Sequence, residues 1–155
     1  MTGSAAETEA VAGRLARGLH AGDVVTVSGD LGAGKTTFAR GFLRGLGGVE
    51  PVRSPTYTLL ELHELDAMTV LHIDLYRLRD EGELESIGLR DWARPGCLWL
   101  IEWPERAGTR LPPPDLTLTF TVGVSGHEIE VHPSTALAHQ WLGTLPQQCP
   151  RHLCS

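Results

Sequence analysis

The stretch Gly29–Thr36, which reads GDLGAGKT, has the residue types and the spacing of a phosphate-binding loop. Glycines can adopt backbone angles that a side chain forbids, so successive N–H groups can turn toward a phosphate. Lys35 supplies a compact positive charge for phosphate oxygens, and the Thr36 hydroxyl is placed to bind Mg²⁺. The stretch therefore predicts a site for a nucleoside triphosphate with Mg²⁺.

Lys35 is the only lysine of the chain, and the other 12 of its 13 basic residues are arginine. An arginine at this position would present a wide planar fork to the loop instead of a compact ammonium group. The single lysine therefore marks a position at which arginine is not an acceptable substitute. The apolar run before the loop and the helical pattern after it, with Phe38 and Phe42 on one face, are the context that such a loop requires.

Two further apolar segments each end in an acidic residue. VLHI precedes Asp74, and LWLI precedes Glu102. In open α/β sheets, ligands bind outside the carboxyl ends of the strands, so both carboxylates are expected near the phosphates. One of them could hold Mg²⁺ and the other could orient an attacking water molecule. The sequence leaves the assignment of these two roles open.

The segment Ser54–Pro55–Thr56 permits two interpretations. The Thr56 hydroxyl could reach the γ-phosphate or its metal ion, as residues of switch loops do. The segment could equally be a turn that only begins a strand.

The pattern of elements predicts an α/β fold, namely a three-layer sandwich of the P-loop NTPase type. Strands that alternate with helices indicate a mainly parallel sheet with antiparallel edge strands, and the late hairpin around Gly123–Gly126 is expected at one edge. Ser4 and Glu7 have the spacing of a capping box, and Ser134 is expected to cap the last helix. The expected helices are 4–19, 36–47, 80–93 and 134–142, and the expected strands lie within 24–29, 54–65, 68–78 and 97–103 and in the hairpin.

The length and composition predict one domain, residues 1–145, and a flexible tail, residues 146–155. The net charge of −6 argues against a large basic surface for direct binding of nucleic acid. The chain shows no signal peptide and no long apolar run, and its three cysteines have no disulfide-like spacing, so a cytoplasmic location is expected. Cys149, His152 and Cys154 could bind a metal ion, although such groups in a tail usually do not.

Three alternative functions differ in the residues that they need. A GTPase would need an Asn-Lys-x-Asp motif, and this chain has no asparagine and no second lysine. A small-molecule kinase would need a lid of arginines, for which Arg77, Arg79, Arg90 and Arg94 are the candidates, but the acidic residues around Glu83 would repel a phosphorylated acceptor. A module that senses nucleotide without significant turnover is the third alternative, and the two carboxylates argue against it.

Five segments, in order, resemble the bacterial TsaE (YjeE) family: GDLGAGKTTFARGFL, SPTYTL, HIDLYRL, ELESIGLRD and IEWPER. The resemblance implies a cytoplasmic ATPase that is required for threonylcarbamoyl-adenosine modification of tRNA. It implies ATP and Mg²⁺ as ligands and the TsaD and TsaB proteins as partners. The family is expected to act on the TsaB–TsaD complex, with slow turnover alone, and not on tRNA itself.

The resemblance also assigns individual residues. It places Thr36 and Glu102 at the family's Mg²⁺ positions, makes Asp74 its Walker-B-like acid, which could also contact the metal, and puts Thr56 in its switch-like loop. Lys35, Asp74, Glu102 and Thr56 are therefore the expected catalytic residues. The expected nucleotide contacts are Thr8, Gly29, Gly32, Ala33, Gly34, Lys35, Thr36, Thr37, Trp103 and His127. His127 stands where the family often has an arginine, and it could replace that arginine in part or leave the contact missing.

Overall fold

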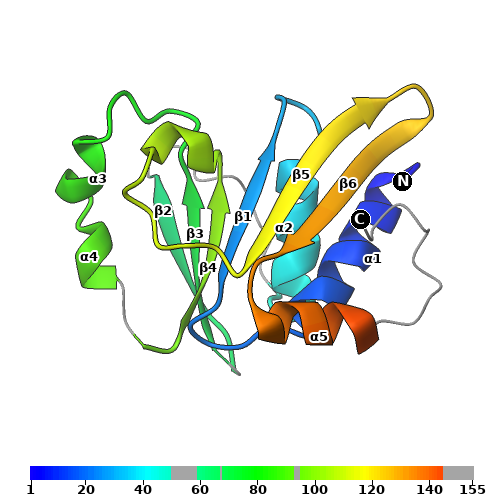
Figure 1. Ribbon diagram of the computed structural model, residues 1–155, viewed down its shortest axis with the longest axis horizontal. Coiled ribbons are helices and arrows are strands. Elements are labelled where there is room, and N and C mark those ends of the chain that lie inside the picture. The colour runs from blue at the N-terminus through cyan, green and yellow to red at the C-terminus, as the bar shows by residue number, and fades with distance from the viewer. Residues whose placement is uncertain (50–58, 67, 93–94, 145–155) are drawn as a thin grey trace.

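A six-stranded sheet forms the centre of the protein, in the order β2-β3-β4-β1-β5-β6 (Figure 1). The structure is a computed structural model, and it describes residues 1–49, 59–66, 68–92 and 95–144. Thr56, Arg94 and the expected tail, residues 146–155, lie outside these ranges. The strands are β1 (Val24–Gly29), β2 (Leu60–Glu64), β3 (Thr69–Asp74), β4 (Cys97–Glu102), β5 (Leu116–Gly123) and β6 (Gly126–Pro133).

The four central strands, β3, β4, β1 and β5, are parallel, and both edge strands are antiparallel to their neighbours. This confirms the predicted α/β fold with a mainly parallel sheet. The expectation of antiparallel pairing at one edge is too narrow, because β2 adds a second antiparallel edge. The Leu65 N–H donates to the Met68 carbonyl at 3.1 Å in the turn between β2 and β3. A connection this tight permits only an antiparallel pair, since a parallel pair needs a long crossover.

Helices cover both faces of the sheet and complete the three layers (Figure 1). All six residues of strand β4 are buried, so both of its faces must be covered. Leu98 and Leu100 point to the face covered by α1 (Ala5–Ala16) and α2 (Lys35–Gly45), where Phe38 and Phe42 pack. The alternate residues of β4 point to the face covered by α3 (Glu83–Ser86), α4 (Leu89–Trp92) and the 3₁₀ helix η1 (Pro104–Ala107).

The helix boundaries differ from the expected ones where local backbone geometry intervenes. Ser4 caps α1 as predicted, with its Oγ 3.2 Å from the Glu7 N–H. The last helix, α5 (Ala136–Thr144), is capped by Thr135 and not by Ser134, because the Ala138 N–H donates to the Thr135 hydroxyl at 3.3 Å. The expected single helix over residues 80–93 is two short helices, since Gly88 has a φ of +67° that ends α3.

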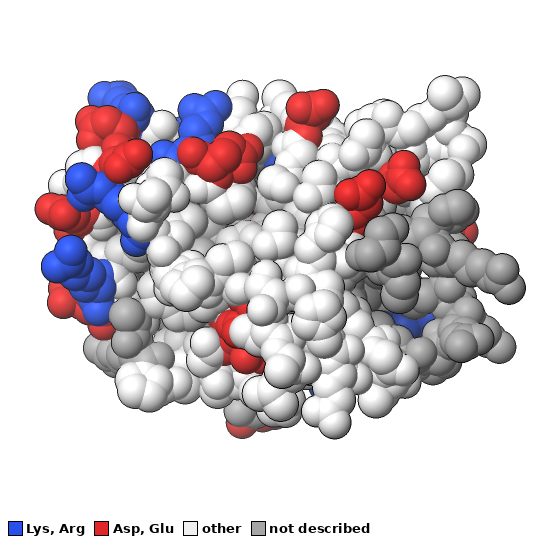
Figure 2. All heavy atoms as spheres, in the orientation of Figure 1, with Lys and Arg blue, Asp and Glu red and all other residues white. Residues whose placement is uncertain are grey.

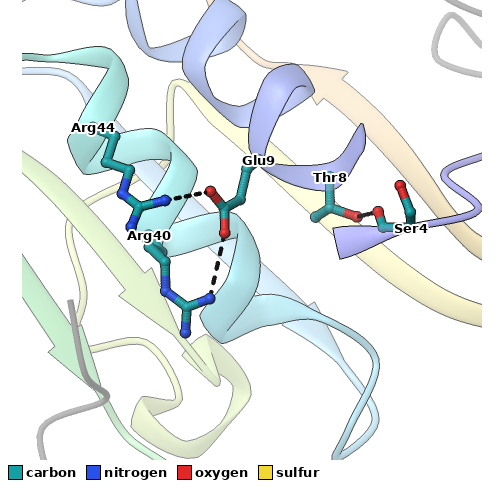
Figure 3. A network of polar contacts seen from close by, with 5 residues as sticks. All are labelled: Ser4, Thr8, Glu9, Arg40 and Arg44. Carbon is teal, nitrogen blue, oxygen red and sulfur yellow. Dashed lines mark hydrogen bonds and ion pairs between the residues drawn. The ribbon is translucent and has the colours of Figure 1, made fainter. Parts of the chain in front are cut away.

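Helices α1 and α2 cross at very short range, and an ion-pair cluster joins them (Figure 3). Glu9 of α1 accepts from Arg40 at 3.3 Å and from Arg44 at 2.7 Å. Glycines make the close approach possible, because a Cβ added at Gly41 would lie 2.4 Å from the Glu9 Cα atom. This contact sets the position of α2, whose first residue is Lys35.

In the view of Figure 2, basic and acidic side chains are mixed around α3 and α4, and further acidic side chains lie over other parts of this face. Arg110 pairs with Glu81 at 3.1 Å and with Glu85 of α3 at 2.9 Å. The region around α3 and α4 therefore does not form a uniformly basic surface. Among the described residues, no helix has both the length and the apolar character needed to cross a membrane.

Candidate functional site

The loop between β1 and α2 owes its shape to glycines at two points of close approach. Gly29 ends β1 with a φ of +135°, and a Cβ added there would lie 2.4 Å from the Phe120 carbonyl oxygen. Gly34 has a φ of +101° and is the N-cap residue of α2. A side chain would be strained at both positions, so the sequence must place glycine there for the loop to close.

The loop ends at the N-terminus of α2, whose N-cap residue offers no side-chain cap. Thr36 and Thr37 follow in the first turn and are half-buried, while Ala33 is buried and Gly32 is exposed. The first N–H groups of a helix carry a partial positive charge and have no partner within the helix. Such a terminus, behind a glycine-rich loop, fits a phosphate group.

Lys35 is held between the loop and an aromatic ring. Its Nζ donates to the carbonyls of Gly29 at 2.5 Å and Asp30 at 2.6 Å, and it lies 4.1 Å from the centre of the Trp103 ring. The side chain is only 5% exposed. Burial lowers the pKa of Lys35, and the nearby carboxylates of Glu102, Glu105, Asp74 and Asp30 oppose that shift. The charges that act on Lys35 therefore include both acids predicted from the strand ends.

Asp74 and Glu102 end neighbouring parallel strands and are partners in the β3–β4 register. Glu102 is also the register partner of Val27 in β1, two residues before the loop begins. Burial raises the pKa of Asp74, a hydrogen bond from the Tyr76 N–H lowers it, and the charge of Glu102 raises it further. The structure thus brings the two acids and Lys35 together at the carboxyl ends of the parallel strands, as the sequence predicts.

A histidine that the sequence reasoning missed holds one of these acids. The Nε2 atom of His72 lies 2.8 Å from Oε1 of Glu102, and both side chains are buried, at 0% and 2% exposure. His72 precedes Asp74 by two residues in β3, so both point to the same face of the sheet. This spacing is the signal that could have identified His72, once β3 and β4 are known to be neighbours.

Trp103, which follows Glu102, has an unusual backbone conformation with a φ of +58°. A non-glycine residue in this region costs roughly 1–2 kcal/mol. The Trp103 N–H donates to the Val27 carbonyl at 3.1 Å, and its ring packs against Tyr76 with the centroids 5.0 Å apart. These contacts turn the ring toward Lys35, so Trp103 packs within the site, and Tyr76 joins it as a second aromatic residue not foreseen from the sequence.

Thr8 and His127 are linked through Thr2, a residue that the sequence alone does not single out. The Thr8 hydroxyl lies 2.9 Å from the Thr2 hydroxyl, and the backbones of Thr2 and His127 exchange two hydrogen bonds, at 2.7 and 2.9 Å. Thr8 also donates to the Ser4 carbonyl in the first turn of α1 (Figure 3). A Cβ added at Gly34 would lie 3.7 Å from Nδ1 of His127, so this group borders the loop.

Thr36, Asp74 and Glu102, the residues predicted to hold a metal ion, would offer it hydroxyl and carboxylate oxygens. Hard cations such as Mg²⁺ prefer oxygen ligands and are usually held by one or two carboxylates together with substrate phosphates. The site therefore fits Mg²⁺ bound together with a phosphorylated ligand.

Comparisons with known proteins agree on one family. The family model described as "Threonylcarbamoyl adenosine biosynthesis protein TsaE" matches residues 2–129. A Haemophilus influenzae protein named "tRNA threonylcarbamoyladenosine biosynthesis protein TsaE" is 42% identical over 114 residues, which are 74% of this chain and 72% of the relative. A Streptomyces coelicolor protein of the same name is 37% identical over 133 residues, which are 83% of this chain and 89% of the relative.

A solved structure supports the same relationship. The crystal structure of YdiB from Bacillus subtilis superimposes with a TM-score of 0.75 and 29% sequence identity, covering 92% of this chain and 91% of that one. The similarity therefore extends over the sheet and both helical layers. From these matches and the geometry of its loop, the chain belongs to the TsaE family.

Proposed function

We propose that this protein binds and hydrolyses ATP with Mg²⁺, and that this reaction serves the threonylcarbamoyladenosine modification of tRNA. The observation that carries the proposal is the convergence of Lys35, Asp74 and Glu102 at one end of the parallel strands. A loop alone would bind phosphate, whereas hydrolysis also needs groups that hold a metal ion and orient water.

The residues of the site divide between these tasks. The loop from Gly29 to Thr37 would hold the phosphates, with Lys35 next to the β- and γ-phosphate oxygens. Thr36 and Glu102 would hold Mg²⁺, and Asp74 would bind it through water or orient the attacking water molecule. When bound, the metal ion would neutralise negative charge on the phosphate oxygens. Thr56 completes the proposal as a residue that contacts the γ-phosphate, from a segment outside the described ranges.

The group formed by Thr8, Thr2 and His127 fits the nucleoside side of the ligand. Nδ1 of His127 lies near Gly34, and β6 lies on the other side of β1 from β4, the strand that Trp103 follows. Nδ1 of His127 is buried and has no hydrogen-bond partner among the described residues. We therefore assign Thr8 and His127 to contacts with the base or ribose, with His127 in place of the arginine common in the family.

The names of the relatives indicate the biological process that the reaction serves. The Haemophilus influenzae and Bacillus subtilis relatives are both named tRNA threonylcarbamoyladenosine biosynthesis proteins. We propose that this protein acts in the same process on the TsaB–TsaD complex, in the cytoplasm, and not on tRNA directly. The net charge of −6 agrees with protein partners, because a direct tRNA-binding protein would need a basic surface.

The test is Mg²⁺-dependent ATP hydrolysis by the purified chain, alone and with purified TsaB and TsaD. We expect slow turnover alone, stimulation by the two partners, and loss of turnover in Lys35→Ala. Glu102→Gln should reduce turnover about 100-fold or more, because a neutral amide is a weaker ligand for Mg²⁺ than a carboxylate and the metal ion would no longer be held against the phosphates. Its binding of nucleotide without Mg²⁺ should change little. Glu130→Gln, an exposed acid on β6, is the matched control and should leave turnover unchanged.

Each failure has a distinct meaning. Turnover that the partners do not change would contradict the proposed pathway and direct attention to a phosphoryl acceptor, as in a small-molecule kinase. Tight nucleotide binding without turnover, even with the partners, would identify a nucleotide-sensing module. Full activity of Lys35→Ala would contradict the assignment of the loop itself.

A further inference from the structure

A second cluster of ligand-type side chains lies on β2 and β3, beside the proposed nucleotide site. Glu61, His63 and His72 each offer one ligand atom, and these atoms all lie within 4.8 Å of one another. The sheet register explains the cluster, because Glu61 is opposite His72 and His63 follows Glu61 by two residues. All three side chains therefore point to the same face of the sheet.

Two nitrogen atoms of this cluster are buried without a hydrogen bond. Nε2 of His63 and Nδ1 of His72 have no partner among the described residues. His72 is fully buried, and the His63 side chain is only 15% exposed. Burying a polar atom without a partner is costly, so two such atoms in one cluster of ligand-type side chains are explained by a shared ligand. The ring centroids lie 6.1 Å apart, so the rings do not hydrogen-bond directly.

The contact between His72 and Glu102 determines which nitrogen of His72 is available. With Glu102 as the acceptor of the 2.8 Å contact, Nε2 of His72 is the donor. In that tautomer the lone pair of the ring is on Nδ1, which is buried and has no hydrogen-bond partner among the described residues. Histidines that bind metal ions commonly donate their other N–H to a carboxylate in this way.

The surroundings of His63 favour the neutral imidazole that a metal ion requires. Burial lowers the pKa of His63, the charge of Glu61 opposes the shift, and His72 adds to it. A neutral imidazole can place a lone pair on Nε2. The carboxylate of Glu61 lies 3.7 Å from this atom and is about half exposed, so it can move to complete the ligand set.

We propose that Glu61, His63 and His72 form a site for one Zn²⁺ ion, separate from the Mg²⁺–nucleotide site. Two imidazoles and one carboxylate, with a water molecule in the fourth position, are a ligand set that zinc accepts. Ligand atoms around a tetrahedral zinc lie about 3.3 Å apart, which follows from a Zn–N distance of about 2.0–2.1 Å. Closing the cluster therefore needs small side-chain rotations and no change of the backbone.

The site has a structural consequence for the nucleotide site that does not depend on the proposed ATPase activity. His72 would contact zinc through Nδ1 and Glu102 through Nε2, so zinc would fix both the ring and the carboxylate that it holds. His72 and Glu102 would form a carboxylate–histidine–zinc relay across β3 and β4. His72 is thus a positioning residue for Glu102.

The experiment measures zinc bound to the untagged full-length chain, stripped with EDTA and dialysed against micromolar Zn²⁺ with excess Mg²⁺ and no nucleotide. Elemental analysis should find one zinc ion per chain. His63→Ala should weaken binding by more than about 100-fold, because the loss of an outer partner of a ligand alone costs 10–100-fold. Zinc should also raise the thermal unfolding midpoint of the unaltered chain but not that of His63→Ala.

Two control variants make the result specific. His132 and Glu130 on β6 are two residues apart, as Glu61 and His63 are, and they form an exposed pair at 3.3 Å. The variant His132→Ala should therefore leave zinc binding unchanged. Cys149→Ser combined with Cys154→Ser should also leave it unchanged, which separates the cluster from the cysteines of the tail. Glu102→Gln should weaken zinc binding 10–100-fold through His72.

Three results would overturn the proposal. The first is the absence of stoichiometric zinc in the unaltered chain. The second is full zinc binding by a folded His63→Ala variant, checked by circular dichroism. The third is loss of zinc in the double cysteine variant, which would assign the ion to the tail. An unchanged zinc affinity in Glu102→Gln would contradict the proposed link from the zinc site through His72 to Glu102. None of these results depends on whether the chain hydrolyses ATP.

Discussion

Lys35 shows how narrowly one residue type can be required. Its ammonium group is enclosed by two backbone carbonyls and the Trp103 ring, with four carboxylates contributing to the local field. A guanidinium group is wider than an ammonium group and needs planar partners for its fork. The enclosure therefore gives a structural reason why an arginine-rich chain has its lysine at this position.

The conservative substitution Lys35→Arg tests this explanation. It keeps the positive charge, yet we expect ATP turnover to fall at least about 100-fold, as for the loss of one preorganised contact to the transition state. Steady-state kinetics of the substituted and unaltered chains measure the effect, and Lys35→Ala provides the reference for complete loss. Near-normal turnover of Lys35→Arg would show that charge alone matters here.

Asp74 is expected to reduce the stability of the folded protein while serving its site. Burial raises the pKa of Asp74, so the folded chain binds a proton at this carboxyl more readily than the unfolded chain does. The free energy of unfolding is therefore reduced above the raised pKa, and the reduction disappears as the pH falls below the ordinary aspartate value of about 4.

The variant Asp74→Asn removes this penalty and keeps an oxygen that can accept from the Tyr76 N–H. We expect it to unfold at a higher temperature than the unaltered chain at neutral pH, with the difference vanishing near pH 4 or below. Thermal unfolding in EDTA without nucleotide checks this. Asp66→Asn, at an exposed position, should have no effect. A destabilised Asp74→Asn at neutral pH would contradict the sign of the argument.

At the scale of elements, the contact between α1 and α2 positions the phosphate-binding loop. Helix α2 begins at Lys35, so a displacement of the helix displaces the residues that would hold phosphate. Added Cβ atoms at Gly41 and Gly45 would meet the α1 backbone at 2.4 and 2.5 Å. The two helices therefore have no room for side chains at their crossing.

Substituting alanine at the crossing should destabilise the fold despite the higher helix propensity of alanine. Overpacking costs about 1–3 kcal/mol, and alanine recovers at most about 1 kcal/mol relative to glycine in a helix. We expect Gly41→Ala to lower the free energy of unfolding in a urea titration. Gly143→Ala in α5 is the matched control, because a Cβ there meets nothing within 4 Å, and it should be neutral or stabilising. Equal stability of the two variants would refute the importance of the crossing.

At the scale of the whole molecule, the candidate site draws on segments far apart in the chain. Thr2 and Thr8 come from the N-terminus, Lys35 from α2, Glu102 from β4 and His127 from β6. A ligand that contacts all of them should oppose unfolding of the entire domain, since it binds the folded state only. ATP at 100 times its dissociation constant would add about 2.7 kcal/mol.

We therefore expect ATP with Mg²⁺ to raise the thermal unfolding midpoint of the unaltered chain by several degrees. The same addition should leave Lys35→Ala nearly unchanged. His127→Ala should show an intermediate shift if the residue contacts the nucleoside. Differential scanning fluorimetry over a range of ATP concentrations measures all three. A shift of equal size in Lys35→Ala would place the nucleotide elsewhere on the molecule.

Much of this architecture is encoded in local sequence. The phosphate-binding loop, the acid-ended strands and the family resemblance all depend on residues a few positions apart, and the structure places Asp74 and Glu102 side by side as expected. The burial of β4 on both faces can likewise be read from its continuous apolar run, which is typical of a central parallel strand. The fold class follows from these local patterns.

The contacts that the sequence did not reveal all cross between segments distant in the chain. The pairing of His72 with Glu102 depends on β3 lying beside β4. The contact of Thr2 with His127 depends on the N-terminal segment reaching the β5–β6 hairpin. The antiparallel edge formed by β2 and the His63–His72 cluster have the same origin. Local patterns indicate which face a side chain points to, but its partner on that face depends on strand order, and strand order follows from long-range packing.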